Sequence, residues 1–388
     1  MFQVDKSLEK PERVMLVGVM LDTDYAAGGA GGQVFYSAES RKAHFQTALD
    51  EAADLVRAAG GELVAVETSK RDRPHSALFV GTGKAEELAA SVRLHDVGLV
   101  VFNHELTPTQ ERNLEKELQC RVLDRVGLIL AIFAKRAQSQ EGKLQVELAQ
   151  LSHLSGRLVR GYGHLQSQKG GIGLKGPGET QLETDRRLIN QKITALKRQL
   201  KNVRQQRATR RQSRMGGRLK TFAIVGYTNA GKSSLFNRLT KAGVLAENQL
   251  FATLDTTARR LFLSHEVSVI LTDTVGFVRD LPHKLVSAFS ATLEETALAD
   301  VLLHVVDVSN PEFGRQMEDV NAVLEEIGAH EIPQLAVYNK IDLQPSKERK
   351  TGIVRDAAGK AAAVNISVAE NLGLDDLRQA MIERALEG

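Results

Sequence analysis

One segment of the chain, TFAIVGYTNAGKSSLFNRL beginning at Thr221, restricts the possible folds more than any other. Its residues Phe222 to Val225 have the apolar, β-branched and aromatic character of a buried strand. The residues that follow match G-x-x-x-x-G-K-[ST] in full, and Ser234 to Leu239 has the pattern of a helix. A strand, a glycine loop and a helix in this order predict a mononucleotide-binding α/β domain with a mostly parallel sheet.

The glycine loop predicts a nucleotide held by its phosphates. Its backbone N–H groups can surround the β-phosphate, Lys232 can reach the β- and γ-oxygens, and the Ser233 hydroxyl can ligate Mg²⁺. The predicted loop contacts are Gly226, Tyr227, Thr228, Asn229, Ala230, Gly231, Lys232, Ser233 and Ser234.

A second motif predicts which base is bound. Asn339-Lys340-Ile-Asp342 follows the apolar strand pattern of 335–338. In guanine-nucleotide proteins, the aspartate accepts from the guanine N1 and N2 hydrogens, the asparagine bonds O6 and the lysine packs on the base plane. Adenine lacks the donor pair, and the unpaired carboxylate would be costly, so GTP is favoured over ATP. Ser367, Val368 and Ala369 stand where a base-contacting turn is expected, without the usual lysine or glutamine.

Two further elements follow the order expected of a GTP switch. Asp273-Thr274-Val275-Gly276 comes after a strand pattern, so Asp273 would hold Mg²⁺ through water and the Gly276 N–H would meet the γ-phosphate. Between the loop and this motif lies Phe251-Ala252-Thr253-Leu254-Asp255, and Thr253 is the predicted switch threonine that completes the metal shell. The five residues of this segment and the four of Asp273-Thr274-Val275-Gly276 are all predicted GTP contacts. The predicted catalytic residues are Lys232, Thr253 and Gly276, and the predicted metal residues are Ser233, Thr253 and Asp273.

The rest of the chain divides into two further segments. Residues 1–140 alternate strand and helix patterns, with strands expected at 14–20, 62–66, 77–80 and 97–102, so we predict a small α/β domain. Gly81-Thr-Gly-Lys84 is either a tight strand-to-helix turn or a phosphate contact.

In 141–218, two stripes of leucine and isoleucine predict an antiparallel helical hairpin with a glycine-rich tip. The second helix is predicted to start at a Thr180 capping box. Residues 219–388 form the GTP-binding domain.

The hairpin segment is strongly basic. Thirteen Lys or Arg and no Asp or Glu lie between 186 and 220, although the whole chain has a net charge of only +3. Charge of one sign favours a polyanion partner, and few aromatic side chains nearby favour structured RNA over stacked single strands. The predicted RNA contacts are Lys169, Gly170, Gly171, Gly173, Lys175, Gly176, Gly178, Arg186 and Arg187.

Composition excludes several other classes. The longest apolar run, 126–134, is too short to span a membrane, and no signal peptide pattern or lipid motif is visible. Cys120 is the single cysteine, which fits a reducing cytoplasm, and the histidines lack zinc-ligand spacing. We therefore expect a cytoplasmic protein with no membrane anchor, monomeric when free.

The glycine-rich stretch GGIGLKGPGETQLETDRR, with FATLD and DTVGFVRDLPH, closely resembles the HflX family of ribosome-associated GTPases. The resemblance covers nearly the whole chain. It implies a cytoplasmic GTPase that binds the large ribosomal subunit and its RNA, and that dissociates ribosomes stalled by stress. Some members remodel RNA or hydrolyse ATP, which leaves an RNA-remodelling factor as the alternative. The sequence ends soon after 377–381, where some members continue into an extra C-terminal domain.

The motifs also indicate slow intrinsic hydrolysis. Phe277 stands where Ras-like enzymes place the glutamine that orients the attacking water, and a phenyl ring cannot form that hydrogen bond. Activation by a partner is therefore expected. Asn229 suggests one further route, because in related GTPases an asparagine at this loop position can hold a potassium ion beside the phosphates.

Overall fold

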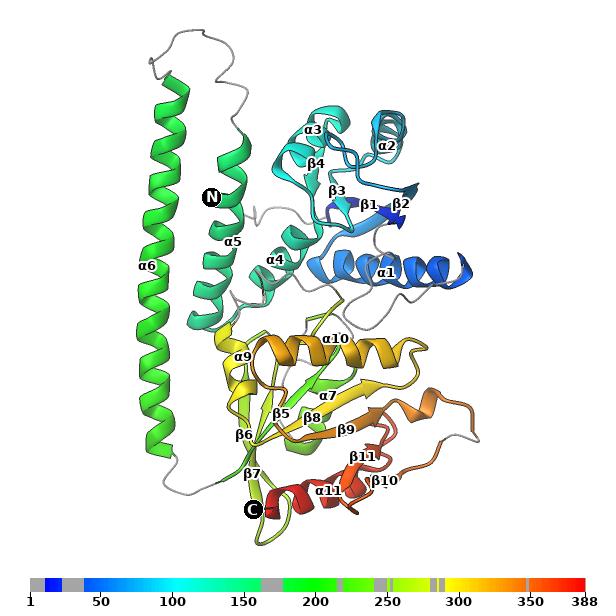
Figure 1. Cartoon of the computed structure of the whole chain (residues 1–388), viewed down its shortest axis with the longest axis vertical. Coiled ribbons are helices and arrows are strands. Elements are labelled where there is room, and N and C mark those ends of the chain that lie inside the picture. Colours follow the sequence, from blue (N-terminus) through cyan, green and yellow to red (C-terminus); the bar gives the residue numbers. More distant parts are fainter. Residues whose placement is uncertain are drawn as a thin grey trace. The chain divides into compact units, whose positions relative to one another are not determined.

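The computed structural model describes residues 11–22, 38–161, 177–214, 219–240, 250–251, 254–279, 285, 290–346 and 349–387. They form two compact units, the first comprising 1–135 with 148–196, and the second 136–147 with 197–388. The structure confirms the predicted fold class, an α/β protein with a helical hairpin and a phosphate-loop domain (Figure 1). No helix in the described ranges is long and apolar enough to cross a membrane.

The first unit contains a four-stranded, all-parallel sheet in the order β2-β1-β3-β4. Its elements are β1 (Arg13–Leu21), α1 (Ala38–Ala59), β2 (Glu62–Arg71), α2 (Thr82–Leu94), β3 (Leu99–Phe102), α3 (Pro108–Leu118), β4 (Arg121–Leu123) and α4 (Arg125–Arg136). The apolar run at 126–134 forms most of α4, whose Ile129 and Ile132 are fully buried.

The prediction of a strand at 77–80 in this unit is wrong. Residues 77–80 form a turn, because the His75 Nδ1 accepts from the N–H groups of Ala77 and Leu78 at 3.3 and 3.1 Å. Phe79 adopts a left-handed conformation with φ 62°, and a single bridge joins it to His75. Phe79 and Val80 are nonetheless buried, so their apolar character reflects the core and not strand pairing.

The hairpin is made of α5 (Gln140–Gly161) and α6 (Pro177–Arg214), which run in opposite directions (Figure 1). Helix α6 begins at Pro177, before the Thr180 start that its capping box predicts, because proline suits the first helical position. In the predicted stripes, Leu196 and Leu200 are buried, whereas Leu148 and Leu151 are only half-buried. Within the first unit, Arg157 of α5 pairs with the fully buried Asp124 at 2.9 Å.

The second unit contains a seven-stranded sheet in the order β10-β11-β9-β8-β5-β7-β6, in which only the edge strands β6 and β10 run antiparallel to their neighbours. Its strands are β5 (Thr221–Gly226), β6 (Thr257–Phe262), β7 (Ser268–Asp273), β8 (Val301–Asp307), β9 (Gln334–Asn339), β10 (Gly352–Arg355) and β11 (Ala361–Asn365). Its helices are α7 (Lys232–Thr240), α9 (Ser290–Ala297), α10 (Phe313–Glu326), the short η3 (Ile341–Leu343) and α11 (Leu374–Leu386).

Strand β5 is buried on both faces, as a central parallel strand requires. Phe222 and Ile224 pack into the cluster that includes residues of α7 and α11, and Ala223 and Val225 pack into the cluster with residues of α9 and α10. The carboxyl ends of β5, β7, β8 and β9 therefore lie along one edge of the sheet, where ligands of such folds bind.

Candidate guanine-nucleotide site

The phosphate loop joins β5 to α7 and needs its two motif glycines for steric reasons. Gly226 has φ 145°, and a Cβ there would lie 2.2 Å from the Val305 carbonyl oxygen. Gly231 has φ 97°, and its Cβ would lie 2.3 Å from the Asn339 Nδ2. The loop backbone is thus packed against β8 at Gly226 and against the base motif at Gly231, and a side chain at either position would push the loop away from that neighbour.

Lys232 and Ser233 both make hydrogen bonds within the site. Lys232 is 6% exposed, and its Nζ donates to the Tyr227 carbonyl oxygen at 2.6 Å. Burial lowers the pKa of Lys232 to about 8, although the nearby Asp273 carboxylate opposes this shift. The Ser233 Oγ donates to the Asp273 Oδ2 at 2.8 Å, so the fold brings together two of the three predicted metal residues.

The donor set fits a magnesium ion. A hydroxyl and a carboxylate are hard oxygen ligands, and Mg²⁺ commonly combines one or two such groups with water and substrate phosphates. Among the described residues, no group of three or more His, Cys, Asp or Glu could hold a metal. The neighbouring oxygens of Ser233 and Asp273 suit Mg²⁺.

The segment after Gly276 is bound to the phosphate loop. The Thr228 N–H donates to the Phe277 carbonyl oxygen at 2.7 Å, and the Phe277 N–H donates to the Gly226 carbonyl oxygen at 3.2 Å. Phe277 is 1% exposed and packs in the same core cluster as Tyr227. Its ring fills the core, so this position supplies no group that could orient water.

Arg279 and Glu312, which are not among the predicted site residues, strengthen this connection. The Tyr227 hydroxyl accepts from the Arg279 N–H at 2.7 Å, and the Arg279 guanidinium pairs with Glu312 at 2.6 Å. The sequence signal was an arginine that directly follows the apolar run TVGFV, because an arginine at such a place has to be paired if it is buried.

The base motif is brought to the loop by its asparagine. The Asn339 Nδ2 donates to the Ala230 carbonyl oxygen at 2.8 Å, and its Oδ1 accepts from the Val368 N–H at 3.1 Å. The structure therefore joins the phosphate loop, the base motif and the turn at 367–369. The Asp342 Oδ1 is buried and has no hydrogen-bond partner among the described residues, as expected of a carboxylate that awaits a donor.

The predicted switch segment is only partly visible. Ala252 and Thr253 lie outside the described residues, while Phe251 and Leu254 are buried. The Asp255 carboxylate accepts from the N–H groups of Gln138 and Ser139 at 2.8 and 2.7 Å, and from the Ser139 hydroxyl at 2.5 Å. These contacts lie at the first turn of α5, within the second unit.

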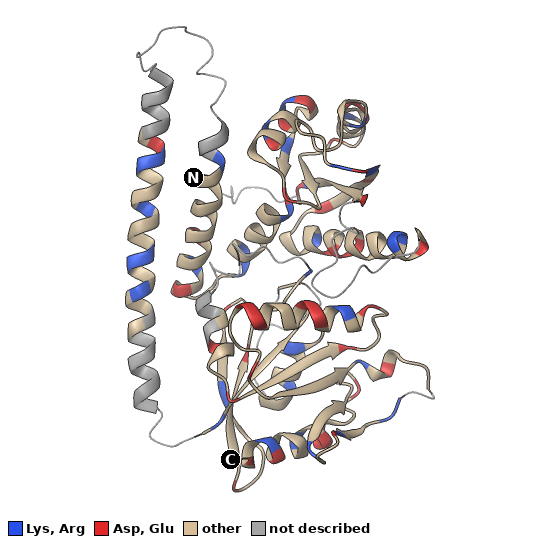
Figure 2. Cartoon of the chain, viewed as in Figure 1, with Lys and Arg blue, Asp and Glu red and all other residues tan. Residues whose placement is uncertain are grey.

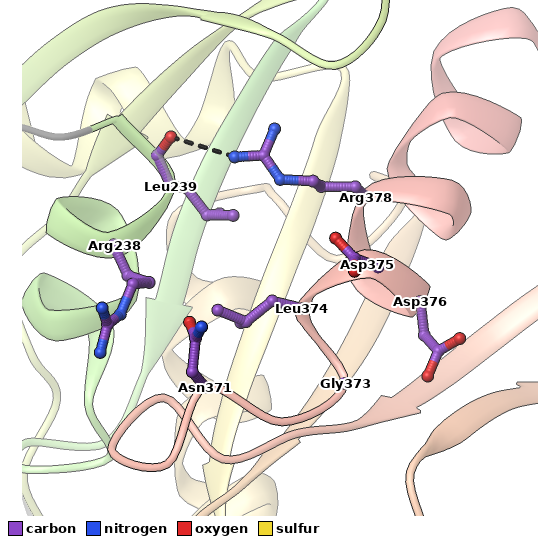
Figure 3. A pocket seen from close by; sticks show the side chains of 8 residues that line it. All are labelled: Arg238, Leu239, Asn371, Gly373, Leu374, Asp375, Asp376 and Arg378. Carbon is purple, nitrogen blue, oxygen red and sulfur yellow. Dashed lines mark hydrogen bonds between the residues drawn. The ribbon is translucent and has the colours of Figure 1, made fainter.

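A polar pocket of about 420 Å³ opens beside the turn at 367–369. Figure 3 shows Arg238 of α7 on one side of it and the start of α11 on the other. The Arg238 Nη2 donates to the Val368 carbonyl oxygen, and the Arg378 Nη2 donates to the Leu239 carbonyl oxygen, both at 3.4 Å. Arg238 thus joins α7 to the turn at 367–369, and Arg378 joins the end of α7 to α11.

The predicted RNA contacts are divided between described and undescribed residues. Arg186 and Arg187 are exposed on α6, and Gly178 lies in its first turn. Lys192, Lys197, Arg198 and Lys201 are exposed farther along the helix (Figure 2). Lys169, Gly170, Gly171, Gly173, Lys175 and Gly176 lie outside the described residues.

The motif Gly81-Thr-Gly-Lys84 in the first unit forms the turn that leads into α2. Gly81 has φ 92° and precedes α2, and the Arg71 guanidinium packs where its Cβ would stand. The Lys84 ammonium pairs with Glu67 at 3.0 Å and with Glu87 at 3.1 Å. These contacts favour the turn over the phosphate-contact reading of Gly81 to Lys84.

Comparison with known proteins agrees with this geometry. Family models described as GTP-binding GTPase N-terminal, GTP-binding GTPase middle region and 50S ribosome-binding GTPase match residues 46–134, 136–214 and 221–340. A crystal structure of SsGBP in complex with GDP covers 96% of this chain and 98% of its own, with a TM-score of 0.53 and 22% identity, which shows a shared fold.

Relatives named GTPase HflX match most of the chain. The one from Escherichia coli (strain K12) is 54% identical over 336 residues, which are 87% of this chain and 78% of that protein. The one from Akkermansia muciniphila is 41% identical over an alignment of 394 positions, which covers 99% of this chain and 86% of that protein. At this identity and coverage, the chain belongs to the HflX family of GTPases.

Proposed function

We propose that this GTPase binds the large ribosomal subunit through its helical hairpin, and that GTP controls this binding in the dissociation of stalled ribosomes. The observation that carries the proposal is the basic α6, where the described side chains of Arg186, Arg187, Lys192, Lys197, Arg198 and Lys201 are all exposed. The name of the matching family model, 50S ribosome-binding GTPase, supports the same partner. A ribosomal partner and a single cysteine in the chain support a cytoplasmic site of action for the proposed activity.

In this proposal, each of the three predicted domains has a different role. Residues 219–388 bind and hydrolyse GTP, residues 141–218 reach the RNA, and residues 1–140 support the hairpin. The tip at 168–178 would approach RNA phosphates closely, because its glycine backbone leaves room and Lys169 and Lys175 lie within it, each beside a glycine. The exposed cations of α6 would neutralise further phosphates.

The proposed hydrolytic site uses the loop for positioning and charge stabilisation. Lys232 would exchange its bond to the Tyr227 carbonyl for the β- and γ-phosphate oxygens, where its charge stabilises the transition state. Ser233, Asp273 and Thr253 would hold Mg²⁺, which neutralises phosphate charge when bound. The Gly276 N–H would donate to the γ-phosphate.

Base recognition would rest on Asn339, Lys340 and Asp342. Asn339 bonds the Ala230 carbonyl and the Val368 N–H, which supports a base bound next to both residues. The buried Asp342 Oδ1 would accept from the guanine N–H groups. Residues 367–369 would complete the wall of the base site.

The experiment is co-sedimentation of the full chain with isolated small and large subunits, with a non-hydrolysable GTP analogue or GDP, over a salt series. We expect binding to the large subunit with the analogue, falling steeply as salt increases. Deleting 168–178 should abolish this binding and leave GTP affinity intact. Equal binding to both subunits, or unchanged sedimentation of the deletion variant, would refute the proposal.

A potassium ion beside Asn229 is a separate part of the proposal. Asn229 has φ 61°, a left-handed conformation that asparagine tolerates better than most residues. If a potassium ion assists hydrolysis, GTP turnover with large subunits should be faster in potassium than in sodium buffer, and Asn229→Ala should remove the difference. Equal turnover in both buffers would exclude this role.

A further inference from the structure

Asp307 ends β8 at the edge of the sheet where the base motif stands. Its backbone pairs with Asn339 at the end of the neighbouring strand β9, and the Val308 N–H donates to the Asn339 carbonyl oxygen at 3.1 Å. Asp307 belongs to none of the nucleotide motifs recognised in the sequence. Its position nevertheless places its side chain beside the residue that follows Asn339, which is Lys340.

Both carboxylate oxygens of Asp307 are used. The Oδ2 lies 2.6 Å from the Lys340 Nζ. The Oδ1 accepts from the Ser309 N–H at 3.0 Å and from the Ser309 hydroxyl at 2.6 Å. Ser309 therefore fixes one side of the carboxylate, so that the other side meets the ammonium in a defined direction.

Lys340 is a residue whose conformation needs such support. Its backbone is left-handed, with φ 66°, and its four-carbon stem has many rotamers when the ammonium is unattached. Packing a mobile lysine stem against a base would cost the entropy of those rotamers at the moment of binding. Attachment of the Nζ to Asp307 fixes the stem before a nucleotide arrives.

The neighbouring Asn339 of the base motif is likewise held in place before a nucleotide binds. The Asn339 amide is fixed on both sides by Ala230 and Val368, whereas the Asp342 Oδ1 has no partner in the described part of the chain. One group is thus left to bind the ligand, and the groups around it are held in place. Asp307 extends this arrangement to Lys340.

We propose that Asp307, supported by Ser309, is a positioning residue for guanine-nucleotide binding that holds Lys340 in the conformation in which its stem covers the base. This inference rests on the proposed assignment of Asn339, Lys340 and Asp342 to the base. Asp307 does not contact the reacting phosphates, so it acts on nucleotide affinity and not on the chemical step.

The experiment uses the full chain and a fluorescent GDP, with GTP measured by competition. Asp307→Asn keeps the shape and the acceptor for Ser309, but presents an amide to the ammonium. We expect it to weaken GDP and GTP affinity by the same factor, roughly tenfold, which corresponds to the lost rotamer restriction of one long side chain. The kcat at saturating GTP should stay within about twofold. Ser309→Ala should give a smaller loss of affinity in the same direction.

Two further variants separate positioning from general stability. Lys340→Met keeps a long stem without the ammonium, and combining it with Asp307→Asn should weaken binding no further than Lys340→Met alone. Glu383→Gln breaks the exposed Arg355–Glu383 pair of the same unit, at 2.9 Å, and is the matched control that should leave affinity unchanged. Melting of the nucleotide-free protein should be the same for Asp307→Asn and this control.

Three outcomes would overturn the inference. They are unchanged affinity in Asp307→Asn, additive losses in the double variant, and a melting temperature that falls enough to account for the lost binding. Failure of the unsubstituted chain to prefer guanine over adenine nucleotides would instead refute the base assignment itself, and the inference with it.

Discussion

The first turn of α5 offers a test in which two opposing effects can be weighed. Asp255 accepts two backbone N–H groups and the Ser139 hydroxyl, while the Ser139 Oγ accepts from the Gly142 N–H at 2.9 Å. Gly142 is a helical glycine, and replacement by alanine ordinarily stabilises a helix by about 1 kcal/mol. Here, however, an added Cβ would lie 2.3 Å from the Asp255 Oδ1 and would displace it.

The magnitude follows from what the displaced carboxylate supplies. A helix-capping side chain contributes about 1 to 2 kcal/mol, and a negative charge at a helix N-terminus adds about 0.5 kcal/mol. The loss of both exceeds the propensity gain of alanine. We therefore expect Gly142→Ala to weaken this turn by about 1 kcal/mol, and Asp255→Ala by about 2 kcal/mol.

Amide hydrogen exchange measures this locally. The N–H groups of Gln138, Ser139 and Gly142 should exchange roughly five times faster in Gly142→Ala and roughly thirty times faster in Asp255→Ala. Thr107→Ala is the matched control, because Thr107 caps α3 by accepting from the Gln110 N–H at 3.3 Å. It should accelerate exchange in α3 alone. Slower exchange in Gly142→Ala would show that propensity outweighs the cap, and would refute the reasoning.

Three other predictions concern ionisable groups in the second unit. Burial lowers the pKa of Lys232 to about 8, and the ammonium must be charged to bind phosphates, so GTP affinity should fall as pH rises above about 8. In calorimetric titrations at pH 9, GTP binding should be accompanied by the uptake of about one proton, and binding without proton uptake would contradict this prediction. Burial likewise lowers the pKa of His304 to about 4, so the folded state binds fewer protons than the unfolded state between about pH 6.5 and 4, and stability is lost as pH falls through that window. At pH 5 the loss should be about 2 kcal/mol by denaturant unfolding, and His304→Gln should remove it; the same loss in that variant would exclude His304 as its source. Arg279→Met removes one partner of a largely buried ion pair with Glu312, and should lower unfolding stability by about 3 kcal/mol, whereas Arg279→Met with Glu312→Met should recover part of it; additive losses would argue against the pair.

The candidate nucleotide site could be recognised in the sequence because each of its motifs is local. The loop at 226–233 combines a strand, obligatory glycines and a lysine within one short stretch, and the structure shows why those glycines are needed. Asp307 could not be found in this way. Its partner Lys340 is close only because β8 and β9 pair in parallel, and a register of that kind depends on the whole sheet.

Elsewhere, composition was a poor guide to local structure. The apolar residues at 77–80 suggested a strand, yet Phe79 and Val80 are buried from within a turn that His75 stabilises. Asp255 of FATLD is among the predicted nucleotide contacts, and the structure adds that its carboxylate accepts from the N–H groups of residues 138 and 139. The turn depends on a side-chain bond of His75, and the Asp255 contact joins segments far apart in the sequence, so periodicity indicates neither of them.

The internal bonds of the site also determine how it would respond to a ligand. The Lys232 ammonium and the Ser233 hydroxyl, which the phosphates and Mg²⁺ would engage, are bonded to the Tyr227 carbonyl and the Asp273 carboxylate. Binding therefore exchanges these bonds for new ones, so its net free energy is smaller than the sum of the new contacts. Tyr227 is further joined to the segment after Gly276 through its hydroxyl and the Arg279 N–H. Tyr227 therefore links Lys232, through its carbonyl, to the segment that contains the Arg279–Glu312 pair, through its hydroxyl, so that loss of the Lys232 bond on nucleotide binding would act on a residue that also holds this segment.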